Sequence, residues 1–128
     1  MPVGTSIACA SLPVRKTKMW HAFDNGKSIG QLGSEGGIII RDEEHIEGSR
    51  ITLERNGRVA PLSITCGISG WMVHTRFFAT EIEAQDAFNQ MEASLDTILK
   101  MIAFGDDAVA TKMQGVSQAI NDFVEQYP

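Results

Sequence analysis

The sequence predicts an α+β domain in which an antiparallel β-sheet of about six strands is followed by two C-terminal amphipathic helices packed on one sheet face. Residues 17–79 consist of short runs of alternating polarity separated by glycine-containing turns, which indicates strands. From residue 80 onward, apolar residues recur at helical spacing. Strands followed by helices are typical of the α+β class, and not of alternating βαβ units. We therefore expect one domain over 17–128, preceded at 1–16 by an extended or mobile arm rich in proline and small residues.

The first predicted element is a hairpin that joins the runs 18–23 and 28–32 through the turn Asp24-Asn25-Gly26-Lys27. Large apolar side chains fall on both faces of this hairpin, which is typical of a strand covered on both sides. The glycine-rich residues 33–37 precede Ile38, Ile39 and Ile40, so they predict a turn into a buried strand. A phosphate-binding loop would need a helix at that point.

Residues 42–47 form the most concentrated polar cluster of the chain. A metal site would use His45 with the carboxylates of Glu43 and Glu47. The alternative is a hydrated loop, and the sequence favours it because the alternating ligands and central glycine of a calcium loop are absent. We expect no metal and no cofactor.

Two hairpins that share a middle strand are predicted over residues 49–79. Asn56-Gly57 suits a two-residue turn that places Arg55 opposite Arg58 and Ile51 opposite Leu62. A second turn at residues 67–70 places Cys66 opposite Trp71. Both turns agree on one core face, made of Ile51, Leu53, Leu62, Ile64, Trp71, Val73 and Phe77. The opposite face is mainly polar.

Thr80 and Glu83 fit a capping box at the start of the first helix. Its apolar stripe is Ala84, Phe88, Met91, Leu95, Ile98 and Ile102. Gly105 then predicts a helix end, and a second helix carries Val109, Met113, Val116, Ile120, Phe123 and Tyr127. These stripes predict an antiparallel helix pair, with one bent helix as the alternative.

The candidate catalytic residues lie on the mainly polar sheet face. In the predicted register His74 is opposite Ser63, with Glu54 and Arg76 nearby, and a serine, a histidine and an acid can form a nucleophile and its base. Cross-strand polar neighbours are also common on exposed sheets. Residues 67–70 do not match the G-x-S-x-G elbow, and the chain contains no dinucleotide, P-loop, zinc or kinase pattern.

The charge distribution limits the kinds of partner that we expect, and the cysteine content bears on the cellular location. Residues 80–128 carry two lysines against nine acidic residues, which argues against nucleic acid as the main partner. A short basic stretch with Arg15, Lys16 and Lys18 keeps a nucleic-acid-binding protein as an alternative. Cys9 and Cys66 lack metal-ligand spacing, so a reducing cytoplasmic setting without a membrane segment is expected.

The function that the sequence favours is a non-enzymatic assembly or binding protein that acts as a homodimer, with an unidentified protein or small molecule as a further partner. The basis is a surplus of apolar side chains that one sheet face and two helices cannot cover. The expected interface consists of Trp20, Ile29, Ile39, Met72 and Phe78. The first alternative is a small enzyme or ligand-binding protein with a polar site near His74.

Overall fold

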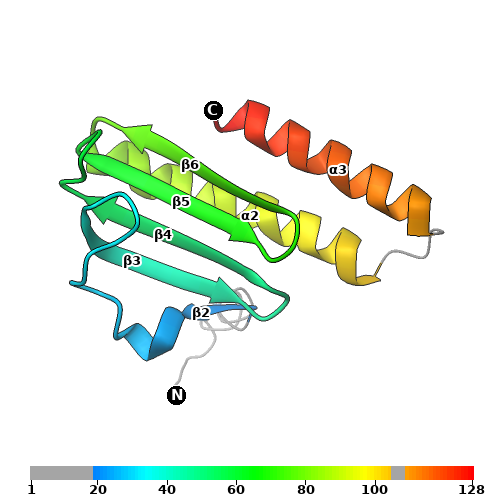
Figure 1. The fold of residues 1–128 in the computed structure, drawn as a ribbon, viewed down its shortest axis with the longest axis horizontal. Coiled ribbons are helices and arrows are strands. Elements are labelled where there is room, and N and C mark those ends of the chain that lie inside the picture. The colour runs from blue at the N-terminus through cyan, green and yellow to red at the C-terminus, as the bar shows by residue number, and fades with distance from the viewer. Residues whose placement is uncertain (1–18, 105–108) are drawn as a thin grey trace, which may run out of the picture.

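The computed structural model describes residues 19–104 and 109–128 of the chain. It confirms the α+β class (Figure 1). Five antiparallel strands are hydrogen-bonded in the order β2-β3-β4-β5-β6, and two helices follow them. The elements are β2 (Trp20–Ala22), the 3₁₀ turn η2 (Phe23–Gly26), β3 (Ile38–His45), β4 (Ser49–Arg55), β5 (Leu62–Ile68), β6 (Met72–Phe78), α2 (Glu81–Phe104) and α3 (Val109–Gln126). The predicted N-terminal arm and the basic stretch at residues 15–18 lie outside the described residues.

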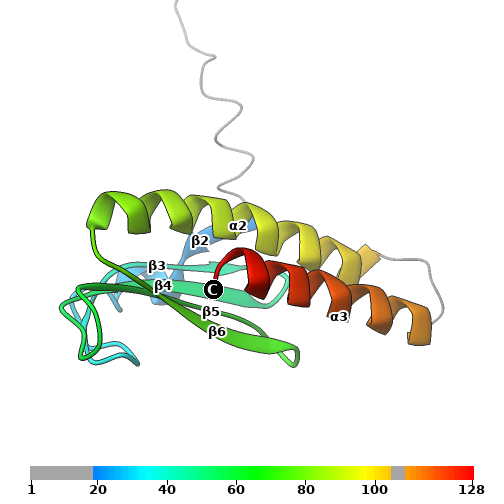
Figure 2. The ribbon, with the colours of Figure 1, turned by 90° about the horizontal axis from the view of Figure 1, so that it is seen from above.

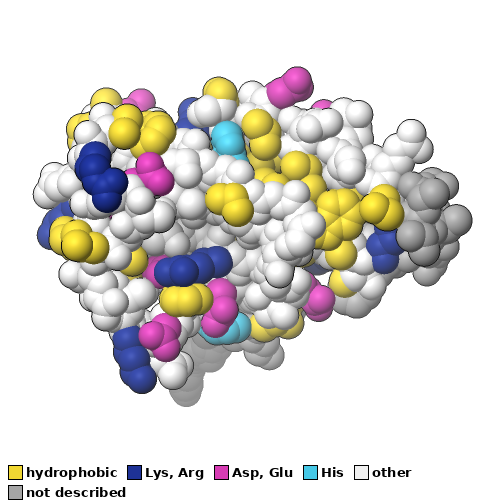
Figure 3. All heavy atoms as spheres, viewed as in Figure 1, with side chains coloured by type: hydrophobic (Ala, Val, Ile, Leu, Met, Phe, Trp, Pro, Cys, Tyr) yellow, Lys and Arg dark blue, Asp and Glu magenta, His cyan; other side chains and the backbone are white. Residues whose placement is uncertain are grey.

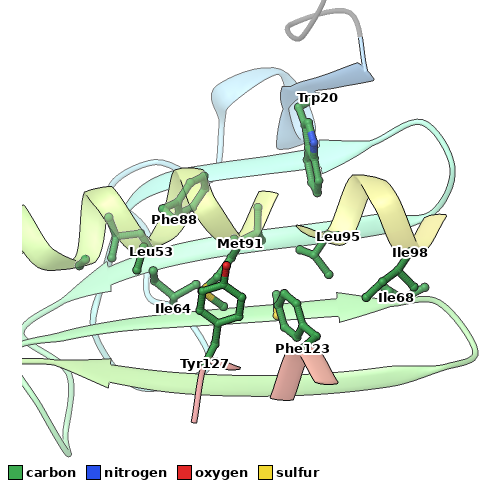
Figure 4. Close-up of a cluster of buried hydrophobic side chains, with 14 of the residues drawn as sticks. Trp20, Leu53, Ile64, Ile68, Phe88, Met91, Leu95, Ile98, Phe123 and Tyr127 are labelled. Carbon is green, nitrogen blue, oxygen red and sulfur yellow. The ribbon is translucent and has the colours of Figure 1, made fainter. Parts of the chain in front are cut away.

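The helices form a layer on one face of the sheet (Figure 2). Helix α2 crosses that face, and α3 runs back beside it on the β6 side, which confirms the predicted helix pair. Side chains from α2 and α3 meet those of β4 and β5 in one core (Figure 4). The predicted α2 stripe is buried from Ala84 to Ile98, whereas Met113 of α3 is more than half exposed and is not a core residue.

The predicted cap of α2 is partly confirmed. The hydroxyl of Thr80 accepts a hydrogen bond from the backbone N–H of Glu83 at 3.3 Å, as in a capping box. The carboxylate of Glu83 accepts from that same hydroxyl at 2.9 Å, and not from the backbone N–H of Thr80.

The predicted register of the β4–β5 hairpin is wrong, although its core face is right. Arg55 pairs with Leu62, four residues beyond the predicted Arg58. The wider loop is closed by a hydrogen bond from Asn56 N–H to the Pro61 carbonyl at 2.7 Å, and β5 begins directly after the proline, which has no N–H. A shift of an even number of residues leaves each side chain on its original face. Ile51, Leu53, Leu62 and Ile64 are therefore all buried as predicted.

The predicted register of the β5–β6 hairpin is also wrong, and here the error assigns the side chains of β6 to the wrong faces of the sheet. Cys66 pairs with His74, three residues beyond the predicted Trp71. An odd shift moves every side chain of β6 to the opposite face. Val73 and Phe77, which were predicted in the core, are consequently 80% and 42% exposed. Because β6 carries apolar residues at both alternations, its own pattern could not select a face.

The predicted N-terminal hairpin does not form. Trp20 pairs with His45 of β3, and residues 28–32 form no strand beyond an isolated bridge from Leu32 to Ile38. Asp24 and Asn25 both adopt positive φ, at 51° and 56°, within a tight turn that turns the chain away from β2. Pairing with β3 lets Trp20 join the core, with its ring edge-on to His45 at 4.9 Å.

The five residues predicted to form a dimer interface do not form an exposed apolar surface. Trp20, Ile39 and Phe78 are buried by the chain itself, and Met72 is partly buried against the core. Ile29 is the one member of that set with a substantially exposed side chain.

Candidate functional site

The side of the sheet opposite α2, which we name the open face, bears the most distinctive surface chemistry. Three cross-strand rows cross β4, β5 and β6 on this side. They are Arg50–Gly67–Val73, Thr52–Thr65–Thr75 and Glu54–Ser63–Phe77. Figure 3 views the molecule from this side, where apolar and charged side chains are interspersed. The hydroxyls of Thr65 and Thr75 lie 3.2 Å apart at the centre of the rows.

Arg50 is held on the open face by a bidentate ion pair with Asp42 of β3. Its Nε and Nη2 donate to the two carboxylate oxygens at 3.0 and 2.7 Å. The side chain of Asp42 is fully buried and also accepts from the Thr52 hydroxyl at 3.0 Å. The hydrogen bond of Arg50 to Asp42 raises the pKa of Arg50, against the opposing effect of burial. The guanidinium also lies 3.5 Å from the centre of the Phe23 ring, so Arg50 is a positioned cation.

Glu54 anchors a loop to the open face. Its buried carboxylate accepts hydrogen bonds from the backbone N–H of Gly37 at 3.0 Å and of Glu35 at 3.2 and 3.3 Å. A Cβ added at Gly33 would lie only 2.2 Å from the carboxylate carbon. A side chain at this position would therefore displace the Glu54 carboxylate from the loop. Glu54 is a candidate catalytic residue by sequence, but in the structure its carboxylate holds this loop.

A hollow of about 400 Å³ lies between this loop and β6. Leu32 and Val73 line it with apolar side chains, Arg50 and Thr65 supply polar groups, and Gly67 contributes no side chain. An adjoining hollow of about 650 Å³ at the β5–β6 turn shares Arg50, Gly67 and Val73. The open face thus offers a depression with apolar walls and a fixed guanidinium.

The candidate catalytic residues are not brought together. Glu54 and Ser63 lie on the open face. His74 and Arg76 lie on the helix side, because the register of β6 differs from the prediction by three residues. His74 Nε2 is hydrogen-bonded to the carbonyl oxygen of Tyr127. The guanidinium of Arg76 lies over the rings of Phe78 and Tyr127. The juxtaposition on which the catalytic hypothesis depended is wrong.

Two of the three candidate metal ligands, His45 and Glu43, are occupied by protein contacts, while Glu47 is exposed. His45 Nε2 lies 2.7 Å from Asp96 Oδ1, and its Nδ1 accepts from the backbone N–H of Glu47 at 3.0 Å. Because Nδ1 accepts, the ring proton is on Nε2 and is donated to Asp96. Burial raises the pKa of Asp96, but hydrogen bonds from His45 and Lys100 outweigh it and lower the pKa. Glu43 binds Arg41 at 3.1 Å.

These contacts connect β3 to α2. Arg41 donates to Gln85 and Asn89 of α2 at 2.8 and 2.9 Å, and His45 binds Asp96 two turns further along. Across residues 19–104 and 109–128, no group of three His, Cys, Asp or Glu side chains is arranged to hold a metal ion. Residues 42–45 of the polar cluster form the end of β3, and residues 46 and 47 lie in the turn that follows. The turn signal at Glu47-Gly48, where Gly48 has φ of 103°, could have located this hairpin.

The histidines and the cysteine of the described residues do not form a nucleophile with its base. Each histidine contacts a carboxylate or a backbone group, and within this part of the chain none is hydrogen-bonded to a serine, threonine or cysteine side chain. Burial raises the pKa of the Cys66 thiol to about 12, so it is a poor nucleophile.

Comparison with known proteins gives no match to a family model, to a curated protein or to a solved structure. No helix in the described part of the chain is long and apolar enough to cross a membrane.

Proposed function

We propose that this chain is a non-enzymatic assembly or binding protein that acts as a homodimer and uses the β6 side of the open face. The observation that carries the proposal is the exposure of Val73 and Phe77 on one strand, with Leu32 exposed across the hollow. Large apolar side chains gathered on one exposed sheet surface are typical of interaction sites. The interface residues predicted from the sequence are different ones. The reasoning is the same, because an exposed apolar surface is expected to be covered by a second copy.

The separation of Ser63 from His74 supports binding over catalysis, because the predicted nucleophile does not lie beside the histidine that would act as its base. We also propose a cytoplasmic location, which the free, buried thiol of Cys66 supports.

Light scattering at micromolar concentration tests the dimer. We expect a mass about twice the 14.0 kDa of one chain. Val73→Glu should lower the mass toward that of one chain, because it places a charge in the proposed interface. Ile82→Glu is the matched control, since Ile82 is 85% exposed but lies at the start of α2. A single-chain mass for the unaltered protein would contradict the proposal.

A further inference from the structure

Strand β6 is an edge strand with a long free side. In the described part of the chain β6 is hydrogen-bonded to β5 alone, and no backbone hydrogen bond joins it to α3. Its seven residues pair with β5 without a bulge, and they include neither proline nor lysine. Bulges, prolines and charged side chains, lysine above all, are the usual protection of an edge against pairing with another chain, and the arginine of β6, Arg76, lies over the rings of Phe78 and Tyr127. The opposite edge is β2, which has only three residues.

The side chains of β6 are self-complementary about Thr75. We infer that β6 pairs antiparallel with β6 of a second copy, with the two-fold axis passing through Thr75; this inference rests on the proposed homodimer. Val73 then lies opposite Phe77 of the second copy, so the two exposed apolar residues of the strand cover each other. On the helix side, His74 lies opposite Arg76. The interface is the same patch on both copies, as a two-fold axis requires.

Other two-fold registers that keep both helix layers on the same side are less favourable. Centring the pair on Arg76 would oppose two guanidinium groups, which is destabilising in a sheet. Centring it on His74 would place Val73 opposite Thr75 and leave Phe77 opposite no residue of the strand. The register centred on Thr75 is the one that buries both Val73 and Phe77.

A charge-pair rescue tests this register. Val73→Glu and Phe77→Lys, each alone, should weaken the dimer about tenfold or more, because each places a charge opposite an apolar side chain twice per dimer. The double variant, Val73→Glu with Phe77→Lys, should recover most of the loss because the two new charges face each other. Both residues are exposed, so circular dichroism should report an unchanged fold. A double variant weaker than either single variant would overturn the register.

Disulfide trapping gives an independent measurement. In a Cys9→Ser background, Thr75→Cys should yield a covalent dimer under mild oxidation, because residues opposite each other are about 5 Å apart between Cα atoms. Thr65→Cys, one strand further from the axis, is the control and should remain uncrosslinked at about three strand spacings. Cys66 is buried and unreactive. The protein could be a dimer by mass that neither single charge variant weakens and that Thr75→Cys does not crosslink. That result would overturn the edge pairing but not the homodimer. A single-chain mass would overturn the homodimer as well.

Discussion

The loop that borders the open face depends on the carboxylate of Glu54, and this dependence can be measured with two substitutions. Glu54→Ala removes the acceptor for the backbone N–H groups of Glu35 and Gly37. Gly33→Ala leaves the carboxylate in place but introduces a Cβ 2.2 to 2.6 Å from its three end atoms. The carboxylate must then move and lose the same two donors. Both substitutions should therefore act through one set of hydrogen bonds.

The expected cost follows from the number of donors. A hydrogen bond to a charged group contributes about 1.5–3 kcal/mol, so two donors give an upper limit of about 3–6 kcal/mol. The Glu35 amide is only partly buried and can bind water once the contact is lost. We therefore expect Glu54→Ala to lower the free energy of unfolding by about 2–4 kcal/mol. Gly33→Ala should cost no more than that.

Urea unfolding followed by circular dichroism would measure both effects and their coupling. In the Glu54→Ala background the added methyl group at residue 33 has space, so the second substitution should cost less than about 0.5 kcal/mol. If the two costs instead add in the double variant, Gly33 and Glu54 do not interact and the account of the loop is refuted.

Two further predictions concern helix α2. Leu95→Ala should destabilise the chain by about 2–5 kcal/mol, because Leu95 is fully buried between α2 and the sheet, while Thr97→Ala on the exposed side should change stability by less than about 0.5 kcal/mol. A loss for Leu95→Ala as small as that control would remove Leu95 from the core. Asp96 has a lowered pKa in the folded chain, so it adds stability above its ordinary value of 3.8 and loses this contribution as the pH falls through the folded value. Asp96→Asn should therefore flatten the decline of unfolding free energy in acid, and an unchanged pH profile would contradict the stabilisation of the Asp96 carboxylate by His45 and Lys100.

Local sequence determined the class, the helices and the core face of the two central strands. The α2 stripe from Ala84 to Ile98 has helical spacing over a long segment, which leaves little freedom in its buried face. Ile51, Leu53 and Ile64 alternate with polar residues, so their core face was predicted correctly although the predicted register was wrong by four positions. A clear apolar alternation fixes a face even where the turn is misjudged.

Only the tertiary structure decided the face of β6, the partner of Trp20 and the composition of the open face. Val73 and Phe77 compete with Met72 and Phe78 for the core, and the choice follows from the turn before Met72 and from the contact of His74 with Tyr127, far along the chain. Trp20 joins β3 because that position gives its ring a buried place beside His45. Asp42 and Arg50 likewise meet only once β3 and β4 are paired. Contacts between distant segments are set by packing of the whole chain, which local periodicity does not encode.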